Sequence, residues 1–292
     1  MMSQDTLSLI NPQTGKLAFK LFSFEDSDLF NHIQRLNYYT IIWTQIGHGK
    51  LKANFSEYEF IDNSLFAFSP YQPFMLQARE KLKGIALNFH PDFFCIHKHQ
   101  QEVACNGVLF NNIYLPPFVL VDPITESTLK MLLEQIKTEI QNPALAQYEL
   151  LISYLKIFLI TASRLKTEQQ HETQQTIPNN KEPFILQNLK NYIELHFKNK
   201  HSASEYANLL NITPKALTKI TKRHFNKTLT DLIAERIVIE AKSELYLTNK
   251  PVKTIAYELG YDDEYYFSRF FKNNANVSPQ TYRDTVGFAK GE

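Results

Sequence analysis

Apolar and polar residues alternate with different periods along the chain, and the first region has the period of β-strands. Between Leu17 and about Leu120, short runs rich in aromatic and β-branched residues are separated by turn signals such as Asp62–Asn63 and Ser69–Pro70. The predicted strands cover 17–24, 37–46, 50–58, 64–69, 74–78 and 82–90. Many short strands with turn residues between them are typical of an antiparallel β-barrel or jelly roll.

The period then changes to that of helices. Asp122 followed by Pro123 is typical of a helix N-cap with proline at the first helical position. A second predicted helix, Gln147–Leu165, has an apolar seam at alternating spacings of three and four, formed by Tyr148, Leu151, Leu155, Phe158, Ala162 and Leu165. Because Ile152, Leu159 and Ile160 lie off this seam, we expect one face to pack on the barrel. The other face, the seam with no polar interruption, is expected to pack on a partner subunit, giving a homodimer through Gln147–Leu165. An internal helical hairpin without a partner is the alternative.

A polar segment, 166–182, follows these helices. It is rich in Gln and Thr and contains Pro178, so we predict a flexible linker. The predicted domains are therefore a sensing and dimerisation domain (1–165), the linker (166–182) and an all-α domain (183–292).

The region after the linker repeats one helical pattern twice. In the first unit, Ser202 and Glu205 form a capping box, a turn follows at Asn211, and Thr213–Pro214 opens a second helix. In the second unit the turn lies at Gly260, and Asp262 or Asp263 caps the next helix. Equivalent positions match between the units: Ala207 with Ala256, Leu210 with Leu259, Asn211 with Gly260, Leu217 with Phe267, Asn226 with Asn276 and Thr228 with Ser278. A helix, a tight turn with Gly or Asn and a second helix form a helix-turn-helix, and two in series are a specific signal.

Leu229–Leu247 connects the two units and contains neither Gly nor Pro, so it is predicted to be one continuous helix. At ~1.5 Å per residue it spans about 28 Å. That length approaches the ~34 Å between successive major-groove faces of B-DNA. The rod could therefore hold two reading helices on adjacent turns of the duplex.

These residues resemble a known family. The segments IAYELGY, YYFSRFFK and VSPQTYR look like the C-terminal signature of AraC/XylS-type transcription regulators. The resemblance implies a DNA-binding regulator that contacts RNA polymerase, with a cupin-like sensing domain before the DNA-binding domain. The expected fold class is thus α+β multidomain, with an N-terminal cupin-like β-barrel and two packing helices ahead of the two helix-turn-helix units.

The expected DNA contacts lie on the outer faces of the two recognition helices. Arg269 is suited to a bidentate contact with guanine, Glu264 can accept from cytosine N4, and Tyr265 or Thr218 can pack on a thymine methyl. The resemblance places Lys215, Thr218 and Lys219 of the first unit, and Glu264, Tyr265, Ser268 and Arg269 of the second, toward the major groove. Residues further along are expected to meet phosphates, namely Lys222, Arg223, His224 and Lys272. A solvated surface is the alternative for each charged residue.

Charge is distributed unevenly in a way that fits DNA contact. Residues 183–292 hold 16 Lys and Arg against 12 Asp and Glu, whereas the rest of the chain holds 15 against 18. There is no run of apolar residues long enough to span a bilayer and no signal-peptide pattern, and two cysteines are too few for a disulfide framework. We expect a cytoplasmic protein without a membrane partner.

Enzyme chemistry is not indicated. Cys95, His97, His99 and Cys105 have a spacing that matches no structural zinc pattern, although metal or thiol sensing remains an alternative. A metal-binding cupin enzyme would need an HxH pair near Gly47–Gly49, where only His48 stands. No phosphate loop, nucleophile elbow or HExxH motif is present, so we expect no catalytic residue, metal or cofactor.

The predicted barrel is rich in aromatic residues, which either fill it or line a pocket for an apolar or aromatic effector. They are Phe55, Phe60, Phe66, Phe68, Tyr71, Phe74 and Phe89. The leading hypothesis is an effector-responsive regulator in which Trp43, the only tryptophan, reports occupancy of the barrel. Its rival is a regulator controlled by its abundance or by a protein partner, with a filled barrel.

Overall fold

The computed structural model describes residues 6–11, 14–26, 28–96, 108–175 and 181–287. The chain forms two compact units, divided between Glu172 and Thr173. We call them the sheet unit and the helical unit. Two short segments, Asn54–Glu57 and Ile113–Leu115, belong to the helical unit.

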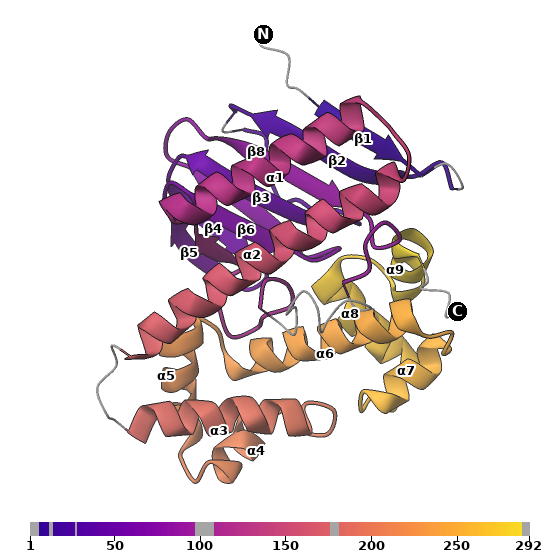
Figure 1. Ribbon diagram of the computed structural model, residues 1–292. Coiled ribbons are helices and arrows are strands. Elements are labelled where there is room, and N and C mark those ends of the chain that lie inside the picture. Colours follow the sequence, from indigo (N-terminus) through magenta and orange to yellow (C-terminus); the bar gives the residue numbers. More distant parts are fainter. Residues whose placement is uncertain (1–5, 12–13, 27, 97–107, 176–180, 288–292) are drawn as a thin grey trace. The chain divides into compact units, whose positions relative to one another are not determined.

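The sheet unit is built from two antiparallel sheets (Figure 1). In the described residues its strands are β1 (Thr6–Ile10), β2 (Leu17–Phe24), β3 (Tyr39–Ile46), β4 (Gly49–Ala53), β5 (Ser56–Phe60), β6 (Ser64–Phe68), β7 (Phe74–Ala78), β8 (Lys83–Phe89) and β9 (Phe118–Leu120). The larger sheet has the order β1-β2-β8-β3-β6-β9, and the smaller has the order β5-β4-β7. The predicted antiparallel architecture is confirmed. The single strand predicted over 50–58 was wrong, because Asn54 takes a left-handed φ of 49° and divides it into β4 and β5.

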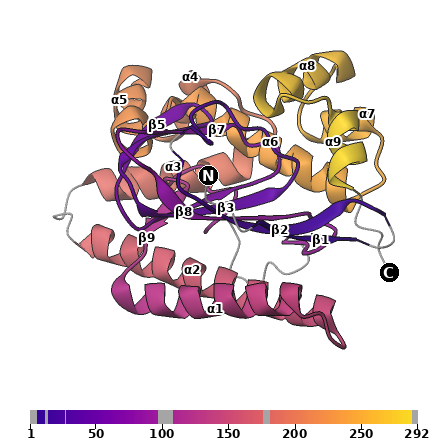
Figure 2. The same cartoon turned by 90° about the horizontal axis from the view of Figure 1, so that it is seen from above.

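Both faces of the larger sheet are buried, and its strands alternate between them. In β3, Tyr39, Ile41 and Trp43 join one apolar core, whereas Ile42 joins a second core between the two sheets. The first core is covered by helices α1 (Pro123–Gln141) and α2 (Gln147–Gln175), which lie across that face of the sheet (Figure 2). Trp43 therefore faces the helices and not the space between the sheets.

The apolar seam of α2 is internal, which corrects the prediction that it binds a partner subunit. Leu155 and Ala162 are 0% exposed and lie in the same core as Leu129 of α1 and Trp43 of β3. The physical reason is that an apolar sheet face needs a cover, so the most apolar face of the helix turns toward the sheet. Asp122 caps α1 as predicted, because its side chain accepts hydrogen bonds from the backbone N–H groups of Ile124 and Thr125.

The helix α2 continues through the first part of the segment predicted to be a flexible linker. It ends at Gln175, and α3 begins at Lys181. The prediction of a flexible chain from residue 166 was wrong, since Lys, Gln and Glu favour a helix and no Gly or Pro occurs before Pro178. Lys166 is even part of the interior. Its ammonium donates to the carbonyl of Pro116 at 2.8 Å, and burial lowers its pKa to about 7.

A side chain of α2 forms hydrogen bonds with the edge strand β9 of the larger sheet. The amide of Gln169 donates to the carbonyl of Leu120 in β9 at 2.6 Å and accepts from its N–H at 3.3 Å. The side chain thus takes the hydrogen-bonding place of a further strand.

The helical unit follows the predicted repeat. In the described residues its helices are α3 (Lys181–His196), α4 (Ala203–Leu209), α5 (Pro214–Phe225), α6 (Leu229–Leu247), α7 (Val252–Glu258), α8 (Glu264–Ala275) and α9 (Pro279–Val286). The predicted capping box is confirmed, and the hydrogen bond from the Ser202 hydroxyl to the Glu205 carboxylate lowers the pKa of Glu205. The equivalent residues Thr228 and Ser278 cap α6 and α9. None of the described helices has the length and apolar character needed to cross a membrane.

Both turns of the repeat have left-handed backbone, as the positions of Asn and Gly predicted. Asn211 has φ 53° and Gly260 has φ 83°, and the helix ends at Asn226 and Asn276 have φ 55° and 63°. Gly260 is also pressed against the chain, because a Cβ placed there would lie 1.8 Å from the carbonyl oxygen of Lys198. This contact joins the end of the α3 segment to the turn of the second unit.

We predict that Leu155→Ala lowers the free energy of unfolding by about 2–5 kcal/mol, because it removes a fully buried side chain from a packed core. The matched control is Leu145→Ala, where the side chain is 99% exposed and the expected loss is below about 1 kcal/mol. Denaturant unfolding measures both. Equal losses would contradict the internal position of the seam.

We predict that Gly260→Ala lowers stability by more than about 2 kcal/mol, because it adds a clash with Lys198 to the ~1–2 kcal/mol penalty of left-handed backbone. Gly15→Ala is the control, since Gly15 also has a positive φ (67°) but no atom within 4 Å of the added Cβ. Thermal unfolding of the full chain followed by circular dichroism compares the two. A loss no larger at Gly260 than at Gly15 would refute the close contact.

Candidate nucleic-acid interface

The helix α6 positions both candidate recognition helices of the helical unit, and its bounds are those predicted from the sequence. Its buried side chains lie on several sides of the helix: Leu229, Leu232, Ile233, Ile237, Val238, Ala241 and Leu245. It packs against α5 of the first helix-turn-helix unit and against α7, α8 and α9 of the second. Figure 1 shows α5 near one end of α6 and α7–α9 near the other.

Cations of the framework around α6 are held by carboxylates. Arg236 forms ion pairs with Glu194 at 2.7 Å and with Glu240 at 2.9 Å. Lys250 pairs with Glu244 and Glu258. Lys242 lies over the ring of Tyr282 at 5.7 Å, and burial lowers its pKa to about 7. These groups serve the packing of the helices.

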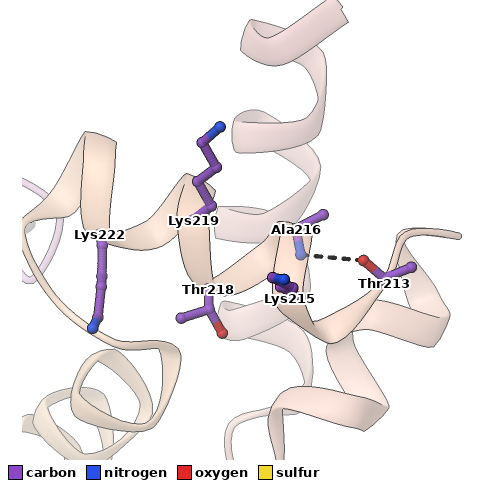
Figure 3. Close-up of a pocket in the computed structure, with 6 residues that line it drawn as sticks. All are labelled: Thr213, Lys215, Ala216, Thr218, Lys219 and Lys222. Carbon is purple, nitrogen blue, oxygen red and sulfur yellow. Dashed lines mark hydrogen bonds between the residues drawn. The ribbon is translucent and has the colours of Figure 1, made fainter.

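The first candidate recognition helix, α5, presents a basic outer face. Leu217 and Thr221 are fully buried against the rest of the unit. The predicted contact residues lie on the exposed side: Lys215, Thr218, Lys219, Lys222 and Arg223. An open groove of about 600 Å³ runs along this face, lined by Thr213, Lys215, Ala216, Thr218, Lys219 and Lys222 (Figure 3).

The N-cap of α5 orders the start of this groove. The hydroxyl of Thr213 accepts a hydrogen bond from the N–H of Ala216 at 3.2 Å, as the Thr213–Pro214 pattern predicted (Figure 3). Figure 3 also shows Lys219 and Lys222 extending from the helix in different directions. The sequence did not single out Thr213 or Ala216 as groove residues, because small side chains give no signal of their own.

The second candidate recognition helix, α8, presents a mixed outer face. Phe267 and Phe271 are fully buried, and Asp263 caps the helix by accepting from the N–H of Tyr266 at 2.7 Å. Tyr265, Arg269 and Lys272 are exposed, whereas Glu264 and Ser268 are half-buried. Tyr266 is 58% exposed and adds a second aromatic ring to the surface beside Tyr265. The helical periodicity places Phe267 in the core, but it did not show that the adjacent apolar residue, Tyr266, is on the surface.

The space between the two sheets is filled with aromatic side chains. Phe66 and Phe68 stack with ring centroids 6.3 Å apart, and Phe68 stacks on Phe74 at 3.9 Å. Phe60 meets Phe66 edge to face at 5.3 Å. Of the other aromatic residues predicted there, Phe89 lies in the core on the helix side, Phe55 is 49% exposed and Tyr71 is half-buried.

The described residues contain no group of three or more His, Cys, Asp or Glu side chains arranged to hold a metal ion. His97, His99 and Cys105 of the alternative sensing site lie outside the described residues. Cys95 is half-buried, and His90 lies 3.4 Å from the carboxylate of Asp92.

Comparisons with known proteins match residues 206–285 to the family described as a helix-turn-helix domain. The chain is 28% identical over 96 residues to the raffinose operon transcriptional regulatory protein RafR of Pediococcus pentosaceus, covering 33% of this chain and 35% of that protein. It is 29% identical over 99 residues to the regulatory protein SoxS of Escherichia coli, covering 34% and 92%. A solved structure, the C-terminal domain of AraT, a response regulator from Geobacillus stearothermophilus, is similar with a TM-score of 0.36 and 29% identity, covering 37% and 90%.

The chain spans between 16% and 60% of the length of the first three curated relatives that it matches. The matched segment starts within α4 and ends within α9, so it contains both units of the repeat together with α6. The C-terminal part of this chain is therefore a DNA-binding helix-turn-helix domain of the AraC/XylS type.

Proposed function

We propose that the whole chain is a sequence-specific, DNA-binding transcription regulator that inserts α5 and α8 into successive major grooves. The observation that carries the proposal is the pair of exposed helix faces mounted on one rigid helix, α6. At ~1.5 Å per residue, the 19 residues of α6 span about 28 Å, close to one turn of B-DNA. Contact with RNA polymerase, which the family resemblance implies, belongs to this proposal.

Within this proposal, Arg269 reads a guanine. Its guanidinium is exposed on α8 and can donate two hydrogen bonds to O6 and N7 of one base. The side chains beside it suit other base edges, since Glu264 can accept from cytosine and Tyr265, 77% exposed, can pack on a thymine methyl.

We expect Arg269→Ala to weaken binding by about 1–3 kcal/mol and to relax the preference at one base pair, because the bidentate contact is lost. Duplexes selected by the wild-type protein from a randomised pool, and all their single-base variants, would be titrated with the purified proteins. Arg269→Lys is the matched control, since it keeps the charge but not the fork of donors. An unchanged preference profile for both variants would remove Arg269 from the base-reading residues.

We infer that no small molecule has to occupy the space between the sheets for DNA binding. The support is the direct stacking of Phe66, Phe68 and Phe74, whose rings already fill that space. This favours control by abundance or by a protein partner over an effector inside the barrel. The same titrations test it, because the purified protein should bind the selected duplex without any added compound. A requirement for an added apolar or aromatic compound would restore the effector-responsive mechanism.

We further propose that the regulator is a homodimer through the outer face of α2. Leu150 and Ile157 are 37% and 47% exposed there, and Tyr154 lies between them on the same stripe. The hydroxyl of Tyr154 donates to Gln135 of α1 at 3.5 Å. Met131, 58% exposed, stands one turn before Gln135 and so extends the same apolar surface.

Ile157→Asp is expected to yield monomers, because it would bury an unpaired charge at the centre of that surface. Leu145→Asp is the control, since Leu145 is 99% exposed between α1 and α2 and should not affect association. Sedimentation equilibrium measures the molecular mass of each variant. A dimeric and folded Ile157→Asp protein would rule out this face.

A further inference from the structure

The two recognition helices carry opposite patterns of charge, and this difference goes beyond the presence of two DNA-reading helices. The helix α5 contains Lys215, Lys219, Lys222 and Arg223 and no acidic residue. Asp262 and the N-cap Asp263 come directly before α8, and Glu264 is its first residue, ahead of its two cations, Arg269 and Lys272. A polyanion such as DNA attracts the first helix along its length and repels the first turn of the second.

The lysines of α5 are also available for a ligand. Lys215, Lys219 and Lys222 lie at spacings of four and three, so they are attached on one side of the helix, where they line one groove and span about 10 Å, with Lys219 and Lys222 extending in different directions (Figure 3). None of these three lysines forms an ion pair in the part of the chain that the structure describes. By contrast, Lys198, Lys227 and Lys250 of the same unit are each held by a carboxylate.

The two faces differ in apolar character as well. The exposed large apolar residues of the recognition helices lie on α8 alone, where Tyr265 and Tyr266 are 77% and 58% exposed. Thymine methyl groups are apolar partners for such rings, whereas phosphates are not. On α5 the groove between the lysines is lined only by small side chains, those of Thr213, Ala216 and Thr218.

We propose that the two helices divide the work of binding, an inference that rests on the proposed function. The helix α5 supplies sequence-independent affinity by contacting the phosphate backbone through Lys215, Lys219 and Lys222. The helix α8 supplies the discrimination between sequences, through Arg269, Glu264 and Tyr265. The acidic first turn of α8 lowers its affinity for any duplex in which Glu264 does not meet a cytosine amino group.

The experiment compares binding of the full chain to two duplexes over a range of salt concentrations. One duplex is selected by the wild-type protein from a randomised pool, and the other has the same bases in shuffled order. The variants are the triple change Lys215→Ala, Lys219→Ala and Lys222→Ala, and the single changes Glu264→Gln and Arg269→Ala. A second triple variant, with Lys16, Lys81 and Lys130 of the sheet unit changed to Ala, is the control for net charge, because all three lysines are exposed there.

The α5 triple variant is expected to reduce the slope of log K against log salt by about 2–3 on both duplexes, at about 0.9 for each lost phosphate contact. The ratio of selected to shuffled affinity should stay within roughly 3-fold of the wild-type ratio. Glu264→Gln should raise affinity for the shuffled duplex by roughly 3-fold, because one repulsive charge is removed. Both α8 variants should lower the ratio, by about 10-fold for Arg269→Ala.

Two results would overturn the division of work. One is a loss of the selected-to-shuffled ratio in the α5 triple variant with an unchanged salt slope, which would make α5 the reading helix. The other is an unchanged ratio in both α8 variants. If the randomised pool yielded no duplex that the wild-type protein binds at low salt, the proposed function itself would be refuted, and this is distinct from the first two results.

Discussion

The arrangement of the helical unit depends on the burial of α6 on several sides at once. Burying each Leu, Ile or Val side chain of this helix stabilises the fold by about 1.5–3 kcal/mol. Because these side chains lie on several sides of α6, a single neighbouring helix could not cover them all. Four helices, α5, α7, α8 and α9, pack against it, and their apolar faces are buried in these contacts. Their remaining faces carry the charged and aromatic residues that can meet DNA. The same burial that stabilises the unit therefore sets the separation of its two recognition helices.

The sheet unit buries its apolar surfaces by stacking layers. Its larger sheet is apolar on both faces, and β6 is buried along its whole length. One face is covered by α1 and α2 and the other by the smaller sheet. Large aromatic rings suit the second space, because they fill the distance of about 10 Å between packed sheets. Contacts between aromatic rings therefore stabilise this interior. The exposed apolar side chains of α2 lie on its outer side.

Much of this fold could be predicted from local sequence signals. The bounds of β2 and α6, the caps at Ser202, Thr213 and Asp122, and the left-handed turns at Asn211 and Gly260 all follow from residue chemistry over a few positions. Decisions that depend on distant partners could not be made this way. The strand pattern did not show that Trp43 faces helices, and the seam of α2 gave no sign of which neighbour covers it. In the site, the exposed face of each recognition helix was predictable, whereas Tyr266 and the groove on α5 needed the packed structure.

The pairing of Gln169 with Leu120 has a consequence for the behaviour of the protein at high concentration. Strand β9 is an edge of the larger sheet, and the free N–H and C=O groups of an edge strand are a template for another chain. The amide of Gln169 occupies one such donor–acceptor pair, that of Leu120. An incoming strand would have to displace this side chain to pair with Leu120. Gln169 belongs to the same helix that covers the face of the sheet. Fraying of α2 would therefore expose the unpaired backbone groups of Leu120 as well as the apolar core.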